Sequence, residues 1–326
     1  MRRLIWVVLA VSGLWSGFWF AGSTVLENAV RDGLAQAAPG VTAARADVAG
    51  FPNRFDLTLT DLRVGEAGQA IWKAPFLQTL SLSYKPWHQV LVFPPTQTVT
   101  LPDGTVLEVA ADKLQASLRV TPSTEAALEL FIIEGHNLSL RDAGPMGVME
   151  VLNFSARPVP GEGSTYDFGL NIQGLRPDSA LFTAVPDRPL PTGGAKVHAD
   201  VIVAFSAPLD RHMGETHPVP VMVDIRAAQV DWGDVAFSAS GQLRPDAGGF
   251  AQGQIDLTLS GWDSVLAVAV AAGAIPPGVA KTWSAMARGM AEGGGNPEQV
   301  QLALILKGGQ MRLGPLPLGP APRFSP

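Results

Sequence analysis

The feature that most constrains the fold is an alternation of apolar and polar residues that recurs between residues 41 and 261. In Lys113–Val120 every second residue is apolar, and residues 168–173 and 254–260 follow the same rule. A period of two places successive side chains on opposite faces of a β-strand. Each segment therefore predicts a strand with one apolar and one polar face, and turn signals such as Pro102-Asp103-Gly104 predict antiparallel meanders.

Helical periodicity is confined to a few short segments. The same pattern predicts further strands near 55–64, 77–85, 97–110, 126–141, 147–156, 195–206, 219–232, 234–243 and 299–314. Between Thr60 and Asp61 the apolar phase slips by one residue, which predicts a β-bulge. The helical candidates are 24–37, 263–273 and 278–291.

Three short helices cannot cover the apolar faces of about fifteen strands. The sheet must therefore pack on a second sheet, close into a barrel or curl around its own apolar face. We predict a mainly β fold, an elongated curled or double antiparallel sheet with a few helices, preceded by one N-terminal transmembrane helix. A curled sheet leaves an apolar trough, which is either self-filled or able to hold a lipid-like ligand. The residues predicted to line this groove are Leu114, Leu118, Leu170, Ile172, Val201, Val203, Ile255, Leu257 and Leu259.

The N-terminus carries the signal for a membrane span. Met1-Arg2-Arg3 is basic, and no charge follows between Leu4 and Gly22. Nineteen helical residues extend roughly 28 Å, close to the hydrocarbon thickness of a bilayer. Because basic residues stay in the cytoplasm, the rest of the chain is expected outside the cytoplasmic membrane. The alternative is a cleaved signal peptide, but its apolar region is usually about 7–15 residues and Phe20-Ala21-Gly22 is a poor cleavage site.

The domain organisation follows from these segments. We predict a transmembrane anchor over 1–22, a helical connection over 23–40 and an exported β-rich region over 41–326. Three prolines and two glycines at 186–194 indicate either a sub-boundary or a long loop within one continuous sheet; we favour the loop. The uncharged run 264–280 is interrupted by Pro276-Pro277, which predicts a buried helix-turn-helix rather than a second span.

Composition excludes several function classes. The chain has no cysteine, so thiol catalysis, thiolate metal sites and disulfides are excluded. Its net charge of −6 argues against nucleic acid as a partner. The phosphate-binding, dinucleotide-binding and serine-hydrolase motifs are absent from the sequence. We predict no catalytic, cofactor-binding or metal-binding residues, and a protein that is not an enzyme.

Two polar clusters are candidates for a catalytic or metal site. His212 and His217 lie five residues apart around Glu215, whereas the zinc-protease motif needs a spacing of four on a helix, so an exposed loop is favoured. Asp231 and Asp234 are expected to turn one strand into the next, with Trp232 beneath. A hydrolase remains an alternative only if Asp231, Asp234 and Glu215 converge in one cleft.

Two sequence blocks carry a family resemblance. They are GFPNRFDL at 50–57 and GGQMRLGPLPLGPAP at 308–322. Together with the N-terminal span they resemble a bacterial family known as domain of unknown function 2125, and the resemblance covers nearly the whole chain. More distantly, the strand pairs at 236–243 and 253–261 resemble AsmA-like envelope proteins. That resemblance implies an elongated, curled sheet with an apolar groove, associated with lipid movement and outer-membrane homeostasis.

The resulting expectation is a non-enzymatic protein of the bacterial inner membrane, single-pass, with the bulk of the chain in the periplasm. Its apolar groove is expected to bind or transport lipid or to serve envelope homeostasis. The alternative is a structural module that binds another envelope protein through an exposed sheet edge. The expected partners are thus the membrane, through Leu4 to Gly22, and a lipid or another envelope protein, with no nucleic acid and no cofactor.

Overall fold

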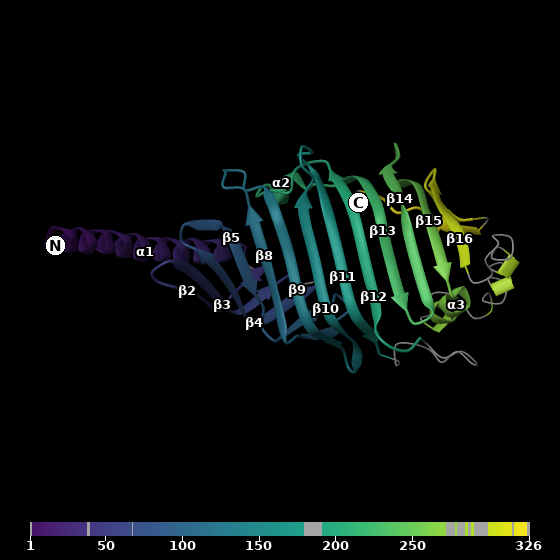
Figure 1. The fold of residues 1–326 in the computed structure, drawn as a ribbon, viewed down its shortest axis with the longest axis horizontal. Helices are drawn as coiled ribbons and strands as arrows, with labels where there is room; N and C mark the ends of the chain where they lie inside the picture. Colours follow the sequence, from purple (N-terminus) through teal and green to yellow (C-terminus); the bar gives the residue numbers. More distant parts are fainter. Residues whose placement is uncertain are drawn as a thin grey trace.

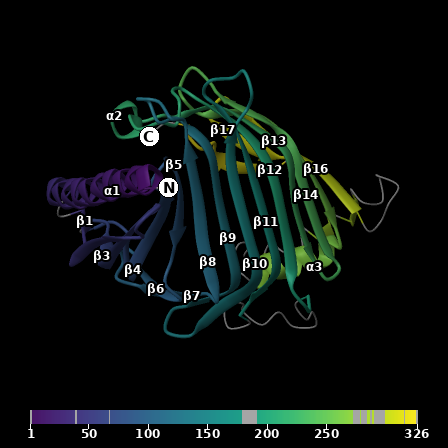
Figure 2. The same cartoon turned by 60° about the vertical axis from the view of Figure 1, so that its left-hand side comes forward.

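A single sheet of 18 antiparallel strands dominates the chain, and the N-terminal helix extends from one end of it (Figure 1). The computed structural model describes residues 2–37, 40–66, 68–178, 191–271, 278, 284–285, 288–289, 299–314 and 316–324. All strands in these ranges belong to one sheet, so the curled single sheet, and not the double sheet, is the architecture. Figure 2 shows the sheet curving along its length.

The helices whose bounds lie within the described residues are α1 (Arg2–Ala37), α2 (Met213–Thr216) and α3 (Trp262–Ala271). The strands of the N-terminal half are β1 (Val41–Thr42), β2 (Arg45–Ala49), β3 (Arg54–Val64), β4 (Ile71–Leu82), β5 (Lys85–Val92), β6 (Thr96–Thr100), β7 (Val106–Ala110), β8 (Lys113–Val120) and β9 (Leu128–Arg141). Those of the C-terminal half are β10 (Pro145–Pro158), β11 (Thr165–Pro177), β12 (Ala195–Phe205), β13 (Pro220–Trp232), β14 (Val235–Pro245), β15 (Ala251–Ser260), β16 (Gln299–Lys307), β17 (Gln310–Leu313) and β18 (Leu316–Pro320).

The strands follow one another across the sheet in chain order. Three pairs of them, β1 with β2, β5 with β6 and β7 with β8, are the two halves of interrupted longer strands, because both halves pair with the same neighbour. Between β5 and β6 the interruption is Pro94-Pro95, which cannot donate backbone hydrogen bonds. Phe93 N still donates to Leu114 O, and Ala111 N to Pro95 O, so the sheet stays joined across the break.

A line of irregular positions crosses seven neighbouring strands, and we call it the crease row. Asp61 and Asn137 have positive φ angles of 52° and 49°, and Gly174 has 65°. Asn137 Nδ2 donates to Asp112 Oδ2 across 2.7 Å. The strand register places these irregularities beside one another, and bulges of this kind bend a sheet locally. The crease row consists of Asp61, Pro75, Pro95, Asp112, Asn137, Glu150 and Gly174.

The predicted elements agree with the structure in most of the chain. The phase slip at Thr60 and Asp61 is the β3 irregularity, and the predicted helix at 263–273 is α3. The segment 97–110 forms a hairpin of two strands whose turn lies at the predicted signal Pro102-Asp103-Gly104. The helix predicted at 278–291 and the boundary at 186–194 lie largely outside the described residues. Thr165 of β11 nevertheless pairs with Ala204 of β12, so the sheet continues across that boundary.

Candidate functional site

One face of the sheet is apolar along almost its whole length. Its central row joins residues that are direct cross-strand neighbours on thirteen strands, and Thr79 is the one polar member. The row runs Val48, Leu57, Thr79, Leu91, Ala116, Ile133, Phe154, Leu170, Ala199, Ala228, Ala239, Leu257 and Leu302. With neighbouring strands about 4.8 Å apart, the row extends roughly 55–60 Å.

The nine residues predicted to line a groove all lie on this face. The register places them in four adjacent rows, because each row lies two residues further along every strand. Leu170 and Leu257 belong to the central row. The row on one side of the central row contains Leu114, Ile172 and Leu259. The first row on the other side contains Leu118, Val201 and Ile255, and the next row beyond it contains Val203.

The large side chains of this face are half-buried. All nine predicted residues fall in this class, although Tyr166, the cross-strand neighbour of Val203 on the same face, is 1% exposed and is the largest fully buried side chain of the described chain. Most other buried apolar residues are alanines. A second packed layer would bury leucine and isoleucine on a central strand almost completely. Among the described residues, the middle of the apolar face therefore stays accessible.

Both ends of the apolar face are covered by other parts of the chain. At the N-terminal end, Trp19 of α1 stacks on Phe55 of β3, with ring centroids 5.8 Å apart. At the other end, Trp262 of α3 packs with Val300, Leu259 and Leu302. The C-terminal residues Ala321 and Phe324 pack against Leu306 and Leu243. The apolar face is thus a surface with two closed ends and an accessible middle.

The docking of α1 onto the β2–β3 turn was not predicted. Trp15 Nε1 donates to Pro52 O and Trp19 Nε1 donates to Arg54 O, each over 2.7 Å. Phe51 contacts the rings of both Trp19 and Phe20. The sequence signal was present as aromatic residues in both segments, but they lie about 35 positions apart and their contact depends on the folded turn.

The opposite face is polar and carries ion pairs between neighbouring strands. Arg119 Nε lies 2.9 Å from Glu129 Oε2, and Arg157 Nη2 lies 2.8 Å from Asp167 Oδ2. These pairs are partly exposed to solvent and contribute about 0–1 kcal/mol each. Their importance is in solubility, since they keep one face of the sheet in water while the other face stays apolar.

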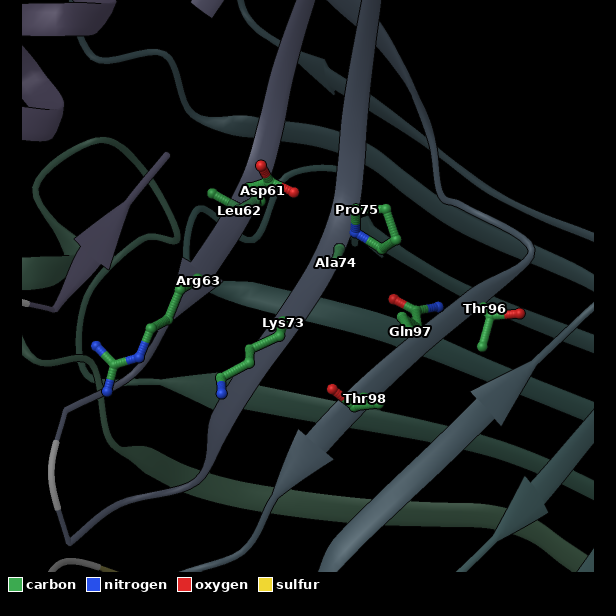
Figure 3. Close-up of a pocket in the computed structure, with 9 residues that line it drawn as sticks. All are labelled: Asp61, Leu62, Arg63, Lys73, Ala74, Pro75, Thr96, Gln97 and Thr98. Carbon is green, nitrogen blue, oxygen red and sulfur yellow. The ribbon is translucent and has the colours of Figure 1, made fainter. Parts of the chain in front are cut away.

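A cavity of about 400 Å³ lies where β4 passes from β5 to β6, beside the crease row (Figure 3). Arg63 and Lys73 are cross-strand neighbours on its wall, with Asp61 near its other end. The remaining lining residues are Leu62, Ala74, Pro75, Thr96, Gln97 and Thr98. The cavity results from the break between β5 and β6. Because its lining residues carry both positive and negative charges, the lining does not indicate a particular class of ligand.

The histidine cluster forms a surface loop. His212 precedes the single turn α2, and its Nε2 lies 3.3 Å from Glu125 Oε2. His217 adopts a left-handed conformation with φ of 45°, and its Nδ1 lies 3.1 Å from the backbone O of Glu215. Over the described ranges, no three ligand-type side chains gather as a metal site would require.

The carboxylates of the hydrolase alternative do not converge. Glu215 precedes β13 and Asp231 lies near the other end of that strand, which separates them by roughly 35–40 Å at the usual strand rise. Asp234 accepts a hydrogen bond from Ser264 Oγ at 2.6 Å, beside the start of α3.

Two side chains at hairpin tips have shifted pKa values with local causes. A hydrogen bond from Arg54 to Asp56 and the charge of that carboxylate raise the pKa of Arg54. The backbone N–H of Thr105 donates to Asp103 Oδ1 and lowers the pKa of Asp103. Both pKa shifts are caused mainly by hydrogen bonds at the hairpin tips.

Comparison with known proteins adds a family match. The model of a family described as "Uncharacterized protein conserved in bacteria (DUF2125)" matches residues 19–322. The matched range contains the whole sheet and Trp19 of α1, whereas Trp15, the other tryptophan bonded to the β2–β3 turn, precedes it. No curated protein and no solved structure matches the chain.

Proposed function

We propose that this chain, which belongs to the DUF2125 family of uncharacterised bacterial proteins, holds lipid acyl chains on its apolar sheet face. In this proposal α1 anchors it in the inner membrane by a single pass, the sheet lies in the periplasm, and the protein has no catalytic activity. The AsmA-like resemblance of the strand pairs at 236–243 and 253–261 points the same way.

The observation that supports the proposal is the accessible apolar face. Four neighbouring rows that are mostly apolar and half-buried in the protein alone form a continuous apolar surface, and such surfaces mark ligand or interaction sites. Burying a methylene group contributes about 0.8 kcal/mol, so an acyl chain of some 16 carbons with half its surface covered gains about 6 kcal/mol. Long acyl chains therefore suit this face better than small polar ligands do.

The alternative function, binding of another envelope protein through an exposed sheet edge, is less well supported. The C-terminal edge strand, β18, contains Pro317 and Pro320, which lack the N–H groups that an added strand would need. The N-terminal edge, at β1 and β2, lies beside α1 and encloses a cavity with Arg31, Leu34 and Ala35. Edge-strand addition is thus disfavoured at one end and restricted at the other.

The lipid proposal is tested by co-purification. The full-length protein, extracted in native lipid particles, is exchanged into mild detergent and its retained lipid is measured by mass spectrometry. Leu257→Arg places a charge in the central row and is expected to reduce retained lipid severalfold. Thr258→Arg, one residue away on the polar face, is the matched control and should leave the lipid content unchanged.

Far-ultraviolet circular dichroism checks that both variants keep the β signal. Equal lipid in the wild type and in both arginine variants, with the β signal intact, would contradict lipid binding at this face.

A further inference from the structure

We propose that two hairpin tips of the sheet dip into the outer leaflet of the membrane that α1 spans. The tips are the β2–β3 turn, residues 50–54, and the β4–β5 turn, residues 83–84, and we call them the membrane foot. Ser83 N and Ser83 Oγ both donate to Asn53 O, at 3.0 and 3.1 Å, so the two turns form one unit. The inference rests on the proposed membrane anchor and adds the place where the sheet meets the bilayer.

The contacts between α1 and the foot set its depth. About 20 helical residues cross a hydrocarbon core of roughly 30 Å. If the span begins at Leu4, the outer boundary of the hydrocarbon core lies near residue 23. Trp19, which donates to Arg54 O, lies about 6 Å inside that boundary, and Trp15, which donates to Pro52 O, lies about 12 Å inside it, at 1.5 Å per residue. A span that includes residues 15–22 therefore brings the foot into the membrane with it.

The backbone of the β2–β3 turn is suited to a site without water. Gly50 O accepts from Arg54 N, Pro52 O from Trp15, Asn53 O from Ser83 and Arg54 O from Trp19. Pro52 has no N–H to satisfy. A loop exposed to lipid must satisfy its polar backbone groups within the protein, and four carbonyls of this turn do so.

The exposed side chains of the foot suit contact with lipid just inside the interface. Phe51 is 49% exposed and Tyr84 is 56% exposed, so both rings can contact acyl chains below the level at which aromatic residues concentrate in membrane proteins. The outer face of the sheet here carries Leu80, Leu82 and Val90. They line a cavity of about 280 Å³ together with Arg54, Lys85 and His88, so the cationic side chains of Arg54 and Lys85 lie beside apolar surface.

The foot also places one end of the apolar face at the bilayer. Phe55 stacks on Trp19 and lies in the same row as Leu118, Val201 and Ile255, from which the polar residues Ser81 and Gln89 separate it. An acyl chain leaving the outer leaflet would thus meet Phe55 before the rest of the face. This arrangement makes the α1 end of the sheet the point where lipid enters or leaves.

The absence of cysteine makes a depth measurement direct, since each single-cysteine variant carries one spin label. The full-length protein is reconstituted in phosphatidylethanolamine–phosphatidylglycerol vesicles with labels at Leu9→Cys, Phe51→Cys, Tyr84→Cys and Val106→Cys. Relaxation by oxygen reports lipid, and relaxation by a water-soluble nickel complex reports solvent. Val106 is the matched control, because it is 50% exposed but lies at the distant β6–β7 hairpin.

We expect labels at Leu9, Phe51 and Tyr84 to be relaxed more by oxygen and the label at Val106 more by nickel. A lipid signal at Leu9 with a water signal at Phe51 or Tyr84 overturns the foot and leaves the anchor standing. A water signal at Leu9 overturns the anchor and the foot together. Tyr84 decides the outcome if Phe51→Cys fails to fold, because Phe51 packs on Trp19 and Phe20.

Discussion

At the scale of single residues, Trp19 connects the helix to the sheet. It is 4% exposed, contacts the rings of Phe51 and Phe55, and donates to Arg54 O. Tryptophan combines a large apolar surface with one hydrogen-bond donor, and both are used here. A substitution of Trp19 by another aromatic residue can therefore remove the hydrogen bond while an aromatic ring stays in the packed site.

Trp19→Phe keeps an aromatic ring but leaves the Arg54 carbonyl without its donor. A buried acceptor without a partner costs about 1–3 kcal/mol, so the free energy of unfolding should fall by that amount. Urea unfolding of the detergent-solubilised chain, followed by circular dichroism, measures it. Trp6→Phe is the control, since Trp6 is 71% exposed, and equal stability of the two variants would contradict the assigned role of Trp19.

At the scale of elements, the crease row is the feature that departs most from a regular sheet. Positive-φ residues on β3, β9 and β11 lie in one line with the breaks between β5 and β6 and between β7 and β8. Each irregularity alone would be a local bulge, but aligned across seven strands they change the direction of the sheet along one line. The apolar phase changes at the same line, from Leu57 and Leu59 to Leu62 on β3.

Gly174→Ala tests the crease row. A β-carbon built at Gly174 would lie 2.4 Å from Glu150 Cδ, and its φ of 65° is unfavourable for alanine. The left-handed conformation alone costs about 1–2 kcal/mol, so thermal unfolding should occur at a clearly lower temperature. Gly163→Ala is the matched control, because a β-carbon there meets no atom within 4 Å. Unchanged stability of Gly174→Ala would show that β11 does not adopt this conformation.

At the scale of the whole molecule, the helix and the sheet share one long axis (Figure 1). The stretch Ile5–Ala37 has a mean hydropathy of 1.6 in its most apolar window, of which 6% is buried. If this helix crosses the membrane, successive strands lie progressively further from the bilayer. The apolar face would then extend away from the membrane surface and not along it.

The orientation has a direct consequence for topology. Because Arg2 and Arg3 precede the span, the C-terminus is expected on the periplasmic side. Alkaline phosphatase fused after Pro326 should be active, and a cytoplasmic reporter such as β-galactosidase at the same position should be inactive. The opposite pattern would contradict the single-span topology and require a second crossing.

The sequence by itself determined the strands and the side to which their side chains point. Alternation in Lys113–Val120 and at 254–260 was enough to place Leu114, Leu118 and Leu257 on a common face, because a period of two is intrinsic to the strand. It missed short or interrupted strands such as β5 and β18, where proline breaks the pattern.

Only the tertiary structure decided what covers the apolar face. Alternation is the same in a curled sheet and in a sandwich, so sequence could not choose between them; the chain-order pairing of all described strands did. The same holds for the docking of Trp19 on Phe55 and for the separation of Glu215 from Asp231. These relations join distant parts of the chain, and they depend on register and curvature, which arise only when the whole sheet has formed.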